Sequence, residues 1–155
     1  MYTNIMFDKL FQMLEQITLY KKRFGGNNNR LDFPEHYGAV FGIIKPRFKS
    51  QPELSMYSRK YPEIHEEIVR IGKEICPFDF KTIQLNKNCC CPPHKDKANQ
   101  SRSILVSFGS YSGGELVIEG VVHNAYHNAI EFDGVNNLHW NLEHTGTKYS
   151  LIYFS

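Results

Sequence analysis

The first half of the chain carries two segments in which apolar residues recur at helical spacing. In the first, between residues 4 and 22, they lie three or four positions apart: Phe7, Leu10, Phe11, Leu14 and Ile17. The second begins at Pro62, a residue suited to a first helical turn, and ends before Pro77; its apolar face carries Ile64, Ile68, Ile71 and Ile75. This pattern predicts two helices, with a short buried strand at residues 38–44 between them.

After Pro77 the pattern changes to short apolar segments divided by turn residues. We expect strands near residues 80–88, 103–108, 115–119, 128–132, 137–142 and 147–154. The glycines of "SYSGGEL" and "EHTGTK" are typical of tight hairpin turns. Two helices followed by six short antiparallel strands predict an α+β fold, a double-sheet roll with the helices packed outside.

The length and composition of the chain predict a single domain over residues 1–155, with helical support at 1–77 and a β core at 78–155. A net charge of +2 is too small to indicate a nucleic-acid-binding protein by itself. No apolar run approaches the roughly 20 residues of a membrane span. Polar and acidic residues interrupt the N-terminal "MYTNIMFDKLFQML", unlike a signal peptide. We therefore expect an intracellular protein, cytoplasmic or nuclear, with no membrane partner.

The stretch "NCCCPPHKDK" contains His94 and Asp96 on either side of Lys95. Residues i and i+2 of an extended segment face the same way, so these two side chains point together. His139 is the best-placed third ligand, because it lies in the β segment "NLHWNL" after the turn-like "FDGVNN". Two histidines and one carboxylate form the facial triad of non-haem Fe(II) oxygenases, which leaves positions open for a co-substrate and dioxygen.

The last predicted strand carries Lys148 and Ser150 on one face. We expect the "HTGT" turn to place this strand antiparallel to the strand of His139, so that both face one cavity. A cation beside a hydroxyl suits the distal carboxylate of a dicarboxylate ligand. Upstream, a predicted strand presents alternating amides that either line this cavity or form an exposed face, and Asn86 is the ligand-binding candidate among them.

The stretches "HKD", "GGELVI" and "FDGVNNLHWNLEHTGTKYSLIYF" resemble the 2-oxoglutarate- and Fe(II)-dependent dioxygenases, over roughly residues 80–155. The resemblance implies a double-stranded β-helix (jelly-roll) core in which His94, Asp96 and His139 bind Fe(II). It also implies that Lys148 and Ser150 bind the 2-oxoglutarate carboxylate. The commoner family residue at position 148 is arginine, whereas lysine keeps the charge and lacks the bidentate fork.

The reaction that the resemblance implies consumes dioxygen and 2-oxoglutarate and hydroxylates a prime substrate, with succinate and carbon dioxide as products. Ascorbate is a candidate reductant. "CPPHKDK" and "GSYSGGELVI" are more similar to the nucleobase-oxidising TET/JBP-like branch than to the prolyl hydroxylases, whereas Lys148 favours the latter. We expect a nucleobase in nucleic acid as the substrate, with peptidyl (prolyl- or lysyl-type) hydroxylation as the alternative. A non-catalytic roll that binds a metal or a small acid is less favoured, since every expected ligand is present.

Three further groups of residues have more than one interpretation. The cysteines Cys89–Cys91 lack zinc-finger or C-x-x-C spacing, so packing as small apolar side chains is favoured over a metal or redox site. His144 is a rival to His139, but its place in the predicted turn indicates a solvent-facing side chain. The basic residues at 21–30 and 45–60 would guide a polyanion if they surround the cavity mouth, or else form an ordinary solvated surface.

Overall fold

The computed structural model of the chain describes residues 4–22, 36–46, 48–96 and 102–155. Its helices are α1 (Asn4–Leu14), α2 (Met56–Lys60) and α3 (Pro62–Ile75). Its strands are β1 (Lys21–Lys22), β2 (His36–Ile44), β3 (Glu53–Leu54), β4 (Thr82–Lys87), β5 (Arg102–Gly113), β6 (Leu116–Ile118), β7 (Val121–His123), β8 (Ile130–Asp133), β9 (His139–Asn141) and β10 (His144–Phe154). None of the described helices is long and apolar enough to cross a membrane.

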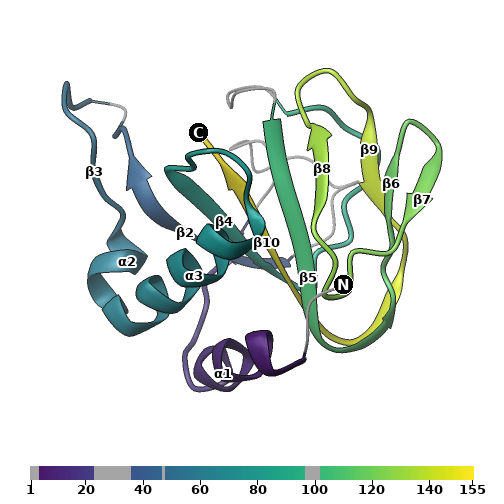
Figure 1. Cartoon of the computed structure of the whole chain (residues 1–155), viewed down its shortest axis with the longest axis horizontal. Helices are drawn as coiled ribbons and strands as arrows, with labels where there is room; N and C mark the ends of the chain where they lie inside the picture. Colours follow the sequence, from purple (N-terminus) through teal and green to yellow (C-terminus); the bar gives the residue numbers. More distant parts are fainter. Residues whose placement is uncertain (1–3, 23–35, 47, 97–101) are drawn as a thin grey trace.

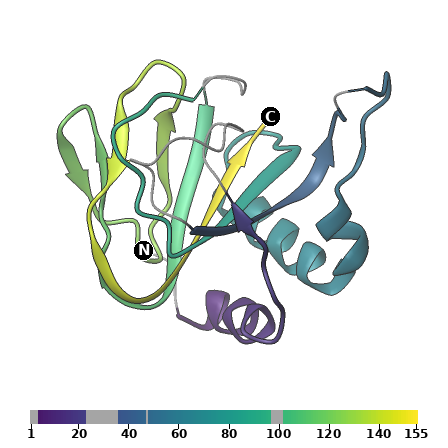
Figure 2. The ribbon, with the colours of Figure 1, turned by 180° about the vertical axis from the view of Figure 1, so that it is seen from behind.

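The strands form two antiparallel sheets, as the sequence predicts. The large sheet has the order β1-β2-β4-β10-β5-β8, with β3 beside β2, and the small sheet has the order β7-β6-β9. The helices gather at the side of the large sheet that carries β2 and β4, whereas the small sheet stands at the far side beside β8 (Figure 1). The view from behind shows the same separation (Figure 2). The fold is therefore a two-sheet roll with its helices outside.

The main core lies between the helices and one face of the large sheet. Alternate residues of β10 point into it, and two buried tyrosines there also anchor the helices. The Tyr149 hydroxyl donates to the Glu15 carboxylate of the segment after α1 at 2.8 Å, and the Tyr153 hydroxyl donates to the Ile68 carbonyl of α3 at 2.6 Å. Because successive strand residues face opposite ways, Lys148, Ser150 and Ile152 point to the other face.

A second, smaller core lies between the two sheets. Leu105 of the large sheet and Leu116 of the small sheet are buried in it together with Phe132, and Ile118 and Ile152 pack against them. This cluster identifies the inward faces of both sheets. On β10 the inward face includes Lys148 and Ser150, and on the small sheet it includes His139, which lies opposite Ile118 in the register of β9 and β6.

Both predicted hairpin turns are wrong. "SYSGGEL" joins β5 to β6, and the segment after β9 joins it to β10, but in each case the two strands belong to different sheets. "EHTGTK" lies largely within β10, where Gly146 is paired with Tyr111 of β5. Gly146 has φ +92°, and a Cβ there would lie 2.2 Å from the Ser110 carbonyl oxygen. The glycine allows a close approach of two paired strands, which local sequence does not distinguish from a turn.

The helical periodicity overestimates the first helix, because α1 ends at Leu14 and the chain turns before Ile17. The helix from Pro62 ends at Ile75, as predicted. The apolar pattern did not predict α2 or the short strands β1, β3 and β7. Each of these short strands pairs with its neighbour over only two or three residues, so tertiary pairing rather than local pattern decides them.

Candidate metal centre

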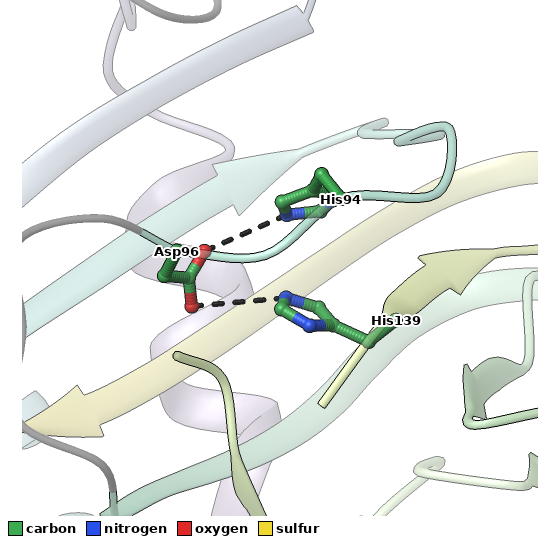
Figure 3. A group of neighbouring side chains, drawn as sticks. All are labelled: His94, Asp96 and His139. Carbon is green, nitrogen blue, oxygen red and sulfur yellow. Dashed lines mark ion pairs between the residues drawn. The ribbon is translucent and has the colours of Figure 1, made fainter. Parts of the chain in front are cut away.

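The structure brings together His94, Asp96 and His139, the three predicted metal ligands (Figure 3). The Asp96 carboxylate lies between the imidazoles, with its Oδ1 atom 3.6 Å from His94 Nε2 and its Oδ2 atom 3.7 Å from His139 Nε2. Across the described residues, this is the one group of three histidine, cysteine or acidic side chains whose ligand atoms lie within 4.8 Å of one another. Ligand atoms bound at right angles to one ion at about 2.1 Å would lie roughly 3 Å apart. Only a small contraction would therefore close the group around a metal.

Main-chain hydrogen bonds hold the three ligands in place. His94 and His139 face each other in an isolated antiparallel bridge, and each amide N–H donates to the carbonyl oxygen of the other at 3.0 Å. The Asn141 amide donates to the Cys91 carbonyl at 3.0 Å, so residues 91–94 extend alongside β9 at the edge of the small sheet. The Asp96 amide donates to the carbonyl of Gly134, just after β8, at 2.7 Å.

Each imidazole ring is oriented by a hydrogen bond at Nδ1, the ring nitrogen that does not face Asp96. Nδ1 of His94 lies 2.8 Å from the Pro92 carbonyl oxygen, and Nδ1 of His139 lies 2.8 Å from the Asn137 carbonyl oxygen. A carbonyl can only accept a hydrogen bond, so both Nδ1 atoms carry a proton, and in the neutral imidazoles the lone pair that a metal would bind is on Nε2. Metal-binding histidines in proteins are oriented by outer hydrogen bonds of this kind.

The charges of the cluster stabilise one another. Burial acts to raise the pKa of Asp96, but the imidazoles of His139 and His94 more than offset it and hold this pKa well below its ordinary value. Burial likewise acts to lower the pKa of His139, but the adjacent Asp96 carboxylate and the Asn137 carbonyl raise it above the ordinary value. Without a metal the site therefore retains a carboxylate and favours a proton on His139, where a divalent cation would compete with that proton.

Gly134 leaves the space that the Asp96 carboxylate occupies. A Cβ at position 134 would lie 2.3 Å from Asp96 Oδ2, closer than any real contact. The turn-like sequence "FDGVNN" did not indicate this role for its glycine. A glycine in such a turn is expected for its backbone freedom, and only the fold shows that the absent side chain matters here.

Lys148 is buried on the inward face of β10, at 3% exposure. Its Nζ atom donates to the Gly114 carbonyl at 2.8 Å and lies 5.9 Å from the ring centroid of Tyr111. Burial lowers the pKa of this lysine, although neighbouring cysteines and Glu115 act in the opposite direction. Among the described residues, no carboxylate lies within 4 Å of its ammonium. A buried cation without a counter-ion is suited to binding an anionic ligand.

A row of polar side chains crosses the inward face of the large sheet beside Lys148. Ser150 is paired with Asn86 of β4 on one side and with Ser107 of β5 on the other, and all three are buried. The Asn86 Oδ1 atom accepts a hydrogen bond from the Gln84 side chain at 3.1 Å. The two alternatives for the amide strand are thus resolved for Asn86, which faces the space between the sheets.

Tyr111, for which the sequence indicated no role, lies in the same region, near the Lys148 ammonium. Burial raises the pKa of its phenol to about 12, although a hydrogen bond with Ser107 acts to lower it. Trp140 is paired with Val117 on β6 and has the parity opposite to His139, so it faces away from the metal group, as expected.

The remaining candidates take other positions. Cys89 and Cys91 are buried, in agreement with a packing role, and none of the four cysteines is in a disulfide bond; they form no metal-ligand cluster in the described part of the chain. Burial raises the pKa of the Cys90 thiol, which disfavours the reactive thiolate. The prediction that His144 lies in a turn and faces solvent is wrong. His144 is the first residue of β10, and its Nδ1 atom is buried.

The predicted basic loops are only partly described. Residues 23–35 and Arg47 lie outside the described residues. Lys49 forms an exposed ion pair with Glu53, and Lys60 lies over the rings of Tyr20 and Tyr61. The chain from Lys49 to Lys60 lies after β2 and includes β3 and α2, at the edge of the large sheet opposite β8 and therefore away from the metal group (Figure 1).

Comparison with known proteins places the fold. No family model matches the sequence, and no curated protein matches it. Among solved structures, NgTET1 in complex with 5mC DNA is similar with a TM-score of 0.63 at 14% identity, over 99% of this chain and 68% of that one. A 2OG-Fe(II) oxygenase family oxidoreductase from Burkholderia pseudomallei has a TM-score of 0.57 at 16% identity, over 95% of this chain and 75% of that one.

A third similar structure is a Pseudomonas putida prolyl-4-hydroxylase, with a TM-score of 0.55 at 13% identity, over 95% of this chain and 82% of that one. The chain therefore has the fold of the 2OG-Fe(II) oxygenases. The predicted α+β fold with a jelly-roll core is confirmed.

Proposed function

We propose that this protein is an Fe(II)- and 2-oxoglutarate-dependent dioxygenase, an oxidoreductase that hydroxylates a prime substrate. One observation carries the proposal: two imidazole Nε2 atoms and one carboxylate converge within 4.8 Å in the fold of the 2OG-Fe(II) oxygenases. This donor set matches the facial triad of non-haem iron sites, which use three protein ligands and leave the remaining positions open.

His94, Asp96 and His139 would hold the iron, and Lys148 with Ser150 would bind the distal carboxylate of 2-oxoglutarate. The buried ammonium of Lys148 and the hydroxyl of Ser150 support this assignment, because both belong to the inward face of β10. Asn86, paired with Ser150, would contribute a further polar contact. When bound, iron and 2-oxoglutarate would supply the oxidising power for hydroxylation, with succinate and carbon dioxide as products. The protein would supply ligands, orientation and exclusion of water.

A nucleobase in nucleic acid is the prime substrate that we propose. Its support is the similarity to NgTET1, a structure with 5mC DNA, over 99% of this chain. A base in duplex DNA would have to be flipped out, so single-stranded nucleic acid is the easier substrate for a chain of 155 residues. Peptidyl hydroxylation is the second candidate, supported by Lys148 in place of the commoner arginine and by the similarity to a prolyl-4-hydroxylase.

Succinate formation tests the proposal. Wild-type protein with Fe(II), 2-oxoglutarate, ascorbate and air should release succinate slowly without a substrate, and Asp96→Ala should abolish it. A cytosine- or 5-methylcytosine-containing single strand should accelerate release in a salt-sensitive manner, whereas acceleration by a proline peptide would favour the second candidate. If the wild-type protein binds neither iron nor 2-oxoglutarate in titrations, the proposed function is wrong.

A further inference from the structure

His144 lies next to the buried cation that the proposed function assigns to 2-oxoglutarate. It is the first residue of β10 and is paired with Gly113 of β5. A Cβ added at the neighbouring Gly114 would lie 3.1 Å from the His144 Cβ and 3.1 Å from Lys148 Nζ. The lysine side chain therefore extends back along β10, so that its ammonium and the Cβ of His144 flank the same glycine.

The imidazole of His144 carries an unsatisfied polar atom. Its Nδ1 is buried and has no hydrogen-bond partner among the described residues. Leaving such an atom without a partner is unfavourable, and native structures usually supply one from protein, water or a ligand. Ser103 Oγ on β5 is the other buried side-chain atom of this kind in the described residues, but its hydroxyl lies opposite Phe132, in an apolar setting. Only the His144 atom lies beside a buried charge.

The charges around this position favour an anion. Burial lowers the pKa of His144, and the positive charge of Lys148 lowers it further. The other groups that act on Lys148 are the thiols of residues 89–91, which are neutral when protonated, and Glu115, which forms no ion pair with it. Lys148, which is cationic, and His144, which can become cationic, thus lie where no described carboxylate forms an ion pair with Lys148. A carboxylate placed there would favour Lys148 and His144 at the same time.

We propose that His144 is a second binding residue for the distal carboxylate of the 2-oxo acid, donating an Nδ1–H hydrogen bond to one carboxylate oxygen while Lys148 binds the other. The inference rests on the proposed function. Lys148 lacks the second, fixed hydrogen-bond donor of an arginine guanidinium, and His144 would supply that donor. A single ammonium fixes a carboxylate through one centre of charge, whereas two donors on separate side chains also fix its orientation. The pair would select a 2-oxo dicarboxylate over a 2-oxo monocarboxylate of the same length.

The test compares two ligands by isothermal titration on Mn(II)-loaded protein without oxygen turnover. 2-Oxoglutarate has the distal carboxylate, and 2-oxopentanoate has a methyl group in its place. His144→Leu should weaken 2-oxoglutarate binding at least tenfold, the cost of a lost hydrogen bond to a charged group, and change 2-oxopentanoate binding less than about twofold. His144→Asn, whose amide can place a donor near the position of Nδ1, should restore most of the lost affinity.

The matched control is Thr145→Val, on the neighbouring residue, whose side chain has the opposite parity and is bound to Ser112 at the surface. It should bind both ligands as the wild type does. The inference is overturned if His144→Leu binds 2-oxoglutarate with wild-type affinity, or if it loses affinity for both ligands equally, which is a merely structural effect. Wild-type protein that binds Mn(II) but neither 2-oxo acid would instead overturn the proposed function, and this inference with it.

Discussion

His94 and His139 are joined through their main chains, since each amide donates to the carbonyl of the other at 3.0 Å. Two residues that are far apart in the sequence thus occupy directly opposed positions of one antiparallel bridge, with their ring centroids 4.3 Å apart. Opposed residues of such a bridge project to the same face. The backbone therefore brings both imidazoles together before any metal binds, and the Asp96 carboxylate completes the group.

Removing a ligand should abolish metal binding without unfolding the protein. Asp96→Ala eliminates the carboxylate between the two imidazoles, and we expect Fe(II) or Mn(II) affinity to fall by at least about 100-fold, the upper end of the effects seen for outer-shell partners. Calorimetric titration measures it. The control is Glu131→Ala, which removes an exposed carboxylate of β8 that forms an ion pair with Arg102 of β5. This variant should retain full metal affinity.

Gly134→Ala should weaken metal binding although it adds only a methyl group. The new Cβ would lie 2.3 Å from Asp96 Oδ2 and would displace the carboxylate, so we expect a loss of about tenfold or more in metal affinity. Gly120→Ala is the contrasting control: its Cβ meets nothing within 4 Å, but its φ of +81° makes alanine unfavourable by about 1 kcal/mol. Equal metal affinities in the two variants would show that Gly134 has no role in positioning Asp96.

Lys148→Met should separate ligand binding from stability. Burial lowers the pKa of Lys148, which means that its charge destabilises the fold at neutral pH. Methionine fills a similar volume without charge, so we expect unchanged or higher stability, with a rise of about 2–4 °C in Tm for each kcal/mol gained. 2-Oxoglutarate affinity should fall by about 100-fold in titrations of the Mn(II)-loaded protein. Lys49→Met, an exposed lysine, should change neither the affinity nor Tm appreciably; a lower Tm for Lys148→Met would show that the ammonium stabilises the fold.

Metal affinity should increase with pH through the neutral range. The pKa of His139 is raised in the metal-free protein, so a proton on its Nε2 atom competes with the metal until the pH exceeds that pKa. Metal titrations at a series of pH values, with imidazole nitrogen shifts followed by NMR, measure this competition. Asp96→Asn should move the pKa of His139 below the ordinary value, because burial then acts without the carboxylate. An unmoved imidazole titration in Asp96→Asn would contradict the coupling.

The same pair predicts the stability of the metal-free protein. His139, with its raised pKa, contributes stability that is fully present below its unfolded value of about 6.5 and is lost as pH rises through the folded value. Asp96, with its lowered pKa, contributes stability above its unfolded value of about 3.9, which is lost as pH falls through the folded value. Their joint contribution should therefore be greatest between about pH 4 and 6.5, measurable as urea unfolding in chelator. Mutation of both groups should flatten this dependence.

The sequence by itself determined the chemistry and most of the elements. His94 and Asp96 share a face because an extended backbone has a period of two, and β10 presents Lys148 and Ser150 together for the same reason. The isoleucines of α3 follow the helical period, and they are buried against the large sheet as that period requires. Such local periodicities need only the neighbouring residues, which explains why they could be predicted.

Tertiary structure alone decided which strands pair and where close approaches occur. The glycines of "SYSGGEL" and "EHTGTK" looked like hairpin turns, but they connect or bend strands whose partners come from elsewhere in the chain. Gly134, just after β8, makes room for Asp96, and Gly114, between β5 and β6, lies against His144 and Lys148 of β10, through contacts between different elements. Pairing of distant strands depends on burial summed over the whole sheet, and the space around a glycine depends on atoms that no local pattern contains.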